Sequence, residues 1–358
     1  MRLTLIDETR YAEEMDDVVV PALAACCDEG WMEPAQRPGL PELDDPGRLH
    51  YLCYDAGRFD ALREDGATAT FRGTIVLSYG FTEFAQKYSE MIWYFLLSGY
   101  SVCVLEHRGH GHSARDVDDP GVVWIDDWRR YAVDLAKFAD TVAREHADGS
   151  PLYLYGHSMG GGVGAAVLEQ YPSLFDKAVL SSPMIAPITA FIPNGVAAAL
   201  AELACGLGLG KLPVAGQTAF CEDLDLTDYR EASEPRVRWY HRQRCADPAC
   251  RTNMPSYNWV REALRLSRAV LRPESCANVE TPMLICQAGH DIWVRNRPQE
   301  TFAARVREGG GDVRLRRFPE SLHEIFSMPN DTLGRYLDCV LDFLDEPVLA
   351  AGAEDDAD

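Results

Sequence analysis

The sequence predicts an α/β fold, with a mostly parallel central sheet, helices on both faces and a helical cap inserted after the sixth strand. From residue 73 onward, short apolar β-prone runs alternate with helical patterns, as in parallel strands joined by helices. The alternation stops near Pro183 and resumes at Met283. One expected strand runs directly into a Gly-x-Ser-x-Gly turn at residues 156–160. These three observations together define the predicted architecture.

The elements follow from hydrophobic period and from turn residues. The expected strands span residues 49–55, 67–72, 74–78, 102–105, 152–155 and 178–180, and then 283–286 and 313–318. The expected helices span residues 11–27, 88–98, 125–145, 299–308 and 332–344, and residues 58–66 are expected to form a hairpin excursion. The chain between the two groups of strands shows helices and loops without a clear strand.

This pattern divides the chain into five parts. Residues 1–70 form an N-terminal extension with the first antiparallel strands, and residues 71–183 form the first part of the α/β core. Residues 184–278 are the helical cap, residues 279–346 the second part of the core, and residues 347–358 an acidic disordered tail. A cap at this point lies at the carboxyl edge of the sheet, where α/β proteins bind ligands.

Charge and cysteine content limit the environment and the partners. The 358 residues include 34 Lys and Arg against 56 Asp and Glu, a net charge of −22, which disfavours nucleic acid as a partner and anionic membrane surfaces on average. Eleven cysteines lack a zinc-type Cys-x-x-Cys pair, and the first residues lack a secretory pattern. We therefore expect reduced thiols and a cytoplasmic protein. Pro187 and Pro193 break the apolar segment at 184–209, which favours a cap helix over a membrane span.

Ser158 is the expected nucleophile. An apolar run at residues 152–155 leads into Gly156-His157-Ser158-Met159-Gly160, and a small-residue helical pattern follows. A strand, a sharp turn and a helix form the context of a nucleophile elbow. The turn is strained, so glycines two residues before and after the serine meet its steric demand.

A nucleophilic serine needs a base, and the base needs an orienting carboxylate. Asp291 comes directly after the expected strand at 283–286, and His323 directly after the strand at 313–318. Both are therefore expected at the sheet edge where Ser158 lies, in the order Ser, Asp, His. His290 is a rival base, but it leaves no carboxylate in the expected place.

The oxyanion hole is expected to use two backbone N–H groups. One belongs to Met159, directly after the nucleophile, and the other to Phe81, in the loop after the strand at 74–78. Gly80 would let that loop approach the substrate; the less favoured alternative is that Gly80 only forms a tight turn.

Three histidines within residues 107–112 raise the question of a metal site. Distant ligands are not evident in the sequence, and such sites need three or four ligands. We therefore expect no metal here, and a loop that packs under the active site instead.

These motifs together resemble the monoacylglycerol lipase and lysophospholipase L2 branch of the α/β-hydrolases, the serine aminopeptidase S33-like group. The resemblance covers residues of about 70 to 346. It rests on residues 79–83, 106–113, 156–161, 284–291 and 322–324, and on residues 255–262, which are similar to the cap-return helix of bacterial lysophospholipase L2 proteins. The resemblance implies Ser158 as nucleophile, Asp291 as acid, His323 as base, and Phe81 with Met159 as oxyanion donors.

The resemblance also implies a carboxylic ester hydrolase that acts on a lysophospholipid or a monoacylglycerol without a cofactor or metal. The sequence departs from the family at Tyr79, where members commonly have histidine. The apolar residues Ile188, Phe191, Ile192, Val196 and Leu200 would suit an acyl chain, or else pack the core of the cap. Contact of the cap with a membrane surface and the oligomeric state are left open by the sequence.

Other functions stay open at this stage. A proline-iminopeptidase-like peptidase would need a cap carboxylate for a free amine, and Glu202, Glu222 and Asp223 are available. A small-ester esterase would use the same serine. A non-catalytic binding protein with this fold would have no need of the complete Ser, Asp and His set.

Overall fold

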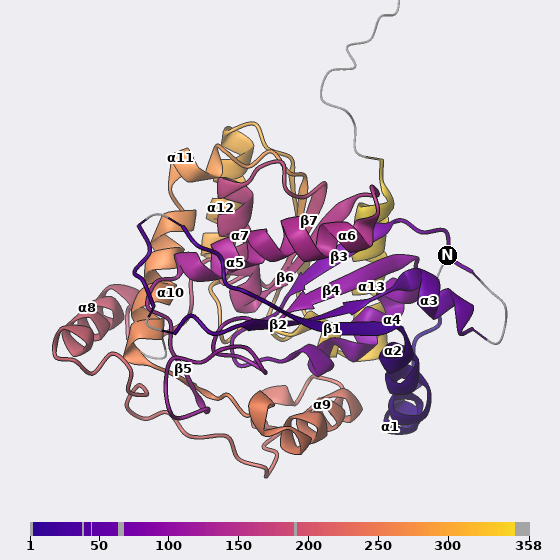
Figure 1. Ribbon diagram of the computed structural model, residues 1–358, viewed down its shortest axis with the longest axis horizontal. Coiled ribbons are helices and arrows are strands. Elements are labelled where there is room, and N and C mark those ends of the chain that lie inside the picture. The colour runs from indigo at the N-terminus through magenta and orange to yellow at the C-terminus, as the bar shows by residue number, and fades with distance from the viewer. Residues whose placement is uncertain (1–2, 38, 44, 64–67, 190–191, 348–358) are drawn as a thin grey trace, which may run out of the picture.

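An eight-stranded sheet forms the centre of the computed structural model (Figure 1), which describes residues 3–37, 39–43, 45–63, 68–189 and 192–347. The strand order is β1-β2-β4-β3-β6-β7-β9-β10. The pairs β1–β2 and β2–β4 are antiparallel, and the other pairs are parallel. The strands are β1 (Cys27–Met32), β2 (Leu49–Tyr54), β3 (Gly73–Ser78), β4 (Tyr100–Leu105), β6 (Leu152–His157), β7 (Lys177–Ser181), β9 (Met283–Ala288) and β10 (Val313–Phe318).

Helices cover both faces of the sheet because alternate strand residues point to opposite sides. One core contains Ile75 and Leu77 of β3 with side chains of α4 and α13; the other contains Val76 of β3 with side chains of α5, α7 and α12. The helices are α1 (Tyr11–Glu14), α2 (Val20–Cys26), α3 (Ala56–Ala61), α4 (Ser89–Leu97), α5 (Arg129–Phe138), α6 (Arg144–Ala147), α7 (Ser158–Gln170), α8 (Asn194–Gly206), α9 (Glu234–Ala246), α10 (Tyr257–Val270), α11 (Pro273–Cys276), α12 (Asn296–Glu308) and α13 (Asn330–Asp345). This confirms the predicted fold class.

Short segments of other helical types join these elements. The π-helical segments η2 (Met15–Val19) and η4 (Ala139–Ala143) continue α1 into α2 and α5 into α6. The 3-10 segments are η1 (Glu8–Arg10), η3 (Ala85–Tyr88), η5 (Thr227–Tyr229), η6 (Pro248–Cys250) and η7 (Ile325–Ser327).

The N-terminal part differs most from the sequence prediction. The hairpin expected at residues 58–66 is wrong over residues 58–63, since α3 spans Ala56–Ala61, and residues 68–72 of the strand expected at 67–72 are not a strand; residues 64–67 lie outside the described part of the chain. The Asp55 side chain caps α3 by accepting a hydrogen bond from the Arg58 N–H at 2.7 Å, and Phe59 is buried beneath the helix. This local capping favours a helix over a turn. The edge strand β1 was not expected, because half of its residues are exposed and the strand carries no alternating apolar pattern.

The cap segment, residues 184–278, lies between the neighbouring strands β7 and β9 and contains α8 to α11. It also contributes the short strand β8 (Met254–Pro255), which pairs with β5 (Val122–Val123) of the core and which the sequence did not reveal. Helix α10 packs between α8 and α7. The cap segment is thus attached to the core both by a strand and by a helix.

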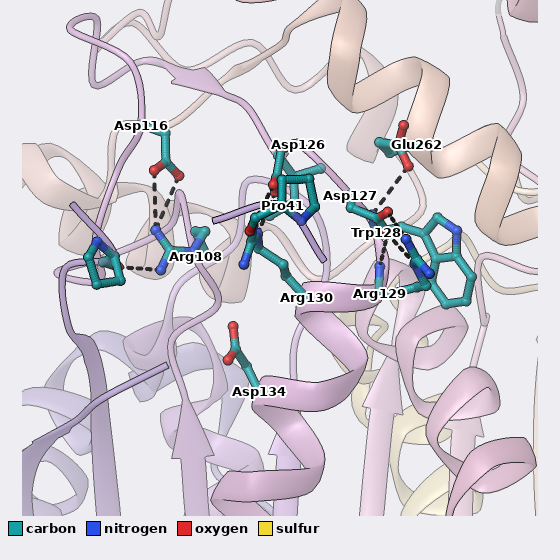
Figure 2. Close-up of polar contacts among 12 residues, drawn as sticks. Pro41, Arg108, Asp116, Asp126, Asp127, Trp128, Arg129, Arg130, Asp134 and Glu262 are labelled. Carbon is teal, nitrogen blue, oxygen red and sulfur yellow. Dashed lines mark hydrogen bonds and ion pairs between the residues drawn. The ribbon is translucent and has the colours of Figure 1, made fainter. Parts of the chain in front are cut away.

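Polar contacts fix α10 and the N-terminal loop to the chain before α5 (Figure 2). Glu262 of α10 accepts a hydrogen bond from the Trp128 N–H at 3.3 Å. Arg130 pairs with Asp126 at 2.6 Å and also donates to the Pro41 carbonyl. Three segments that are distant in sequence therefore meet at the start of one helix.

Membrane-spanning helices were also sought. Among the described residues, none of the helices combines the length and the hydrophobicity that a membrane span requires.

Candidate active site

Ser158 stands at the junction of β6 and α7. Its φ is +51°, in the left-handed region that residues with a Cβ rarely adopt. The turn brings α7 so close to β3 that a Cβ on Gly160 would lie 2.0 Å from the Ser78 carbonyl oxygen. A larger residue at position 160 would therefore displace the turn. The elbow expected from the sequence is present at this position.

His323 and Asp291 reach Ser158 from two neighbouring strands. Asp291 follows β9 and His323 follows β10, and these strands pair in parallel, so both loops leave the same edge of the sheet. The His323 Nε2 lies 2.8 Å from the Ser158 Oγ, and the His323 Nδ1 lies 2.7 Å from the Asp291 Oδ2. The structure thus brings together the three residues that the sequence selected.

The second carboxylate oxygen of Asp291 is also engaged. The Asp291 Oδ1 accepts hydrogen bonds from the N–H groups of Trp293 and Val294, both at 2.9 Å. Burial raises the pKa of Asp291. The hydrogen bond and the charge attraction from His323, together with the two amide hydrogen bonds, outweigh burial and bring the pKa below its ordinary value. Asp291 is therefore ionised at neutral pH and held in one orientation.

His290 does not compete for the serine. Its side chain is 57% exposed, and its Nδ1 lies 3.1 Å from the Glu231 carboxylate. The ring that reaches Ser158 is that of His323. The rival base weighed from the sequence is therefore not placed at the nucleophile.

The loop after β3 lies against the nucleophile. A Cβ on Gly80 would lie 3.0 Å from the Ser158 Cβ, so this position admits only glycine without rearrangement. Within the described part of the chain, the Phe81 and Met159 N–H groups donate no hydrogen bond to a protein acceptor. They remain available for a substrate oxygen, and their role as oxyanion donors stays a prediction.

Glu83 fixes this loop, a role that was not predicted from the sequence. Its Oε2 accepts hydrogen bonds from the Gly80 N–H at 2.5 Å and the Tyr88 hydroxyl at 2.6 Å. Tyr79 of the same loop is fully buried, with its ring 5.6 Å from that of His107. The loop is therefore held by a carboxylate and a buried aromatic side chain.

Lys87 links the loop to the base. Its ammonium group lies 2.8 Å from the Glu83 Oε1 and 2.6 Å from the Glu324 Oε1, and Glu324 directly follows His323. Burial lowers the pKa of Lys87, but attraction to Glu324 and Glu83 outweighs burial and raises it. The i,i+4 spacing of Glu83 and Lys87 is a signal for their pairing; the pairing with Glu324 has no local signal.

The histidines at 107–112 do not gather around one point. His107 and His110 are buried, and burial lowers their pKa values to about 4 and about 3. The His107 Nε2 lies 2.8 Å from the Ser78 Oγ at the end of β3. These two neutral rings pack beneath the site, whereas His112 points elsewhere and is 40% exposed.

The cap segment forms part of the wall of the site. The ring of Trp259 on α10 lies 3.9 Å from that of Phe81, between centroids, at 34°. The loop after β3 thus packs directly on α10 of the cap segment. A shift of α10 would therefore move this loop, which lies against Ser158.

A comparison with protein families identifies the chain. The model of a family described as serine aminopeptidase, S33 matches residues 69–330. The chain belongs to the serine aminopeptidase S33 family. This confirms the resemblance drawn from the motifs, and the matched region extends from just before β3 to the start of α13.

Two curated relatives are similar to this S33 chain in sequence over most of its length. It is 30% identical over 256 residues to the probable lysophospholipase L2 of Haemophilus influenzae, with 71% of this chain and 79% of that protein covered. It is 28% identical over 264 residues to the monoacylglycerol lipase of Mycolicibacterium smegmatis, with 73% and 85% covered.

Solved structures share the fold of this S33 member. A soluble variant of monoglyceride lipase from Saccharomyces cerevisiae aligns with a TM-score of 0.64 at 21% identity, covering 88% of this chain and 96% of that one. A thermostable carboxyl esterase from Bacillus coagulans aligns with a TM-score of 0.67 at 16% identity, covering 90% and 99%.

Proposed function

We propose that this protein is a serine hydrolase that cleaves carboxylic esters of lipids, a lysophospholipid or a monoacylglycerol, through an acyl-enzyme on Ser158. The observation that carries the proposal is the continuous chain of contacts from Ser158 through His323 to Asp291. Such an arrangement turns a weak serine hydroxyl into a nucleophile. Relatives named lysophospholipase and monoacylglycerol lipase support the substrate class.

The chemistry follows from this geometry. His323 removes the Ser158 proton as the Oγ attacks the ester carbonyl, and Asp291 keeps the imidazole in the tautomer that accepts this proton. The N–H groups of Phe81 and Met159 stabilise the oxyanion. His323 then protonates the leaving alcohol, and later activates the water that releases the fatty acid from Ser158.

An exposed apolar surface on the cap segment supports a lipid substrate. Leu200 and Leu203 of α8 are 49% and 60% exposed, and Leu207, directly after the helix, is 68% exposed. In the loop after β9, two residues from Asp291, Trp293 is 56% exposed. Exposed apolar patches of this kind mark contact surfaces. We propose that this surface, the α8 face, contacts the lipid aggregate that supplies the substrate, by apolar contact because the net charge is negative.

The contacts of two of the three cap carboxylates considered, Glu202 and Glu222, weigh against a peptidase. The Glu202 Oε1 lies 2.7 Å from the Arg265 guanidinium, and the Glu222 Oε1 lies 3.0 Å from that of Arg251. A carboxylate that already pairs with arginine is less available for the free amine of a peptide. The ester hydrolase is therefore the better-supported function.

A substrate panel tests the proposal. We expect turnover of long-chain p-nitrophenyl esters, a monoacylglycerol and lysophosphatidylcholine, and a fall in kcat of about a millionfold in Ser158→Ala. Turnover of short esters alone would leave a small-ester esterase, and turnover of a proline anilide alone would establish a peptidase. Absence of labelling by a fluorophosphonate probe in folded protein would favour the binding-protein alternative.

The α8 face has its own test. We expect the double variant Leu203→Ser, Leu207→Ser to raise the KM for monoacylglycerol in vesicles and to leave the hydrolysis of a short soluble ester unchanged. Val18→Ser is the matched control, since Val18 is 51% exposed on the N-terminal segment. Equal effects of the two changes on vesicle substrate would contradict a lipid-contacting α8 face.

A further inference from the structure

Three potential metal ligands meet outside the active site. They are His50 of β2, Glu106 directly after β4, and His112 at the end of the following loop, and their ligand atoms all lie within 4.8 Å of one another. The Glu106 Oε2 lies 2.9 Å from the His50 Nδ1 and 3.4 Å from the His112 Nδ1. We propose that these three residues bind one divalent transition-metal ion of the Zn²⁺ class, and we call them the His–Glu–His cluster.

The donor set fits this class of ion. Two imidazoles and a carboxylate suit Zn²⁺ and its neighbours. Ligands at about 2.0–2.1 Å in a tetrahedral site are separated by about 3.3 Å, which is close to the two separations measured from Glu106. Three protein ligands leave a fourth position for water.

Carboxylates hold the outer nitrogens of both imidazoles. The His50 Nε2 lies 2.7 Å from the Glu29 Oε1, and the His112 Nε2 lies 3.2 Å from the Asp247 Oδ2. Metal-bound histidines usually carry such a partner on the second nitrogen, which fixes the tautomer and the ring orientation. In both rings the nitrogen that faces Glu106 contacts that carboxylate in the absence of metal, and binding would replace this contact by a bond to the ion.

Glu106 provides charge and a free oxygen. It is fully buried, and within the described residues its Oε1 has no hydrogen-bond partner. Its Oε2 accepts a hydrogen bond from the His112 backbone N–H at 2.6 Å. A Cβ on Gly111 would lie 2.2 Å from this carboxylate, so the loop can wrap around it only with glycine there. A buried carboxylate with one oxygen that lacks a hydrogen-bond partner is a strong ligand for a dication.

An ion can reach the cluster from solvent. His112 is 40% exposed and lines a surface cleft of about 570 Å³ beside Trp31 and Asp116. A second group of potential ligands lies between the sheet and a helix, with Cys53 on β2, Cys103 on β4 and His146 on α6, and both thiols are fully buried. The His–Glu–His cluster is thus the more accessible of the two groups.

The position of Asp247 gives the ion a structural consequence. Asp247 follows α9 in the cap segment. His50, in contrast, lies on β2 of the core sheet, and Glu106 lies in the loop directly after β4. An ion bound here would connect the cap segment to the core through Asp247 and His112. The proposal is independent of the hydrolytic function.

Titration calorimetry on the full chain, stripped of metal with a chelator, tests the site with ZnCl₂. We expect one Zn²⁺ per chain, at least tenfold weaker binding in His112→Ala, and a roughly tenfold to hundredfold loss in Asp247→Asn, which removes only the outer carboxylate charge. His241→Ala is the matched control because His241, on α9, is also partly solvent-accessible, and its ring contacts a backbone carbonyl and the Phe220 ring but no carboxylate. It should bind as the unaltered protein does.

A second readout separates this cluster from the thiols. Co²⁺ added in place of Zn²⁺ should give visible bands of a nitrogen and oxygen site, without the intense thiolate charge-transfer band, and Cys53→Ser should not change the spectrum. Equal Zn²⁺ affinity in His112→Ala, loss of binding in Cys53→Ser, or no binding to the unaltered protein would each overturn the proposal.

Discussion

Ser158 illustrates how single residues are held at this site. A non-glycine residue in the left-handed region costs about 1–3 kcal/mol, and Ser158 adopts it with φ at +51°. The surroundings maintain it, since the Ser158 carbonyl accepts a hydrogen bond from the Met184 N–H at 2.8 Å. The strain keeps the hydroxyl at the tip of the turn, within reach of His323.

The role of Asp291 can be tested with an isosteric change. Asn at position 291 can still accept the two amide hydrogen bonds that Asp291 Oδ1 accepts, so the loop should be preserved. The amide group would donate to His323 or hold the wrong tautomer. We expect kcat on a p-nitrophenyl ester to fall by about 10⁴-fold, with an unchanged melting temperature.

His290→Ala is the control for this measurement. His290 is adjacent to Asp291, but its side chain pairs with Glu231 at the surface. We expect its kcat to match that of the unaltered protein. A loss in His290→Ala as large as that in Asp291→Asn would instead support His290 as the base.

At the scale of elements, α5 carries a buried acid that opposes folding at neutral pH. Asp134 is 3% exposed and accepts a hydrogen bond from the Ala35 N–H at 2.6 Å; it lies below Arg130 in Figure 2. Burial raises its pKa to about 6, although the Ala35 amide and the charges of Arg108 and Arg130 act in the opposite direction. The folded state therefore holds this proton more tightly than the unfolded state.

The sign of the pH dependence follows from that difference. Below the unfolded pKa of 3.8 both states are protonated; as pH rises to about 6 the unfolded chain loses the proton first, so that Asp134 lowers the free energy of unfolding. The full loss is up to about 3 kcal/mol, at about 1.4 kcal/mol per pKa unit. We expect Asp134→Asn to gain stability relative to the unaltered protein between about pH 4 and pH 7, measured by urea unfolding.

Asp140→Asn is the control on the adjoining segment η4. Its side chain is 66% exposed and pairs with Arg144. Its stability difference should stay nearly constant across the same pH range. A constant difference for Asp134→Asn as well would show that Asp134 is ionised in the folded state throughout.

At the scale of the whole molecule, one buried ion pair joins three parts of the chain. The Arg236 guanidinium of the cap helix α9 contacts both Glu90 carboxylate oxygens of α4, each at 2.8 Å, and both residues are buried. The hydroxyl of Tyr11, on α1, donates to the same carboxylate at 2.9 Å. The α9 half of the cap is thus anchored, whereas the α8 half presents its apolar residues to solvent.

This anchor predicts a large effect on stability. Arg236→Met leaves the Glu90 carboxylate buried without its partner, and breaking such a pair costs about 3–5 kcal/mol. We expect this loss in the free energy of unfolding, together with faster amide exchange in α9. Arg238→Met, on the same helix, is the control; its pair with Glu234 is exposed and should contribute less than about 1 kcal/mol. Equal losses would contradict an anchoring role for Arg236.

The sequence alone determined the fold class, the six strands of the parallel part of the sheet and the selection of Ser158, Asp291 and His323. The physical reason is local. Hydrophobic period identifies a strand from its own residues, and the carboxyl ends of parallel strands meet at one edge, so position along the chain already brings these residues together. The same reasoning failed for α3 and β1, where a capping side chain and an exposed edge override the pattern.

Only the tertiary structure decided which distant side chains meet. Lys87 and Glu324 pair across 237 positions, and His50 meets Glu106 across 56. The histidines of residues 107–112 did not predict a metal site from the sequence. One ligand of the proposed His–Glu–His cluster, His50, lies on another strand. Such contacts depend on how strands and helices pack, and packing energy is summed over surfaces that no local window of sequence contains.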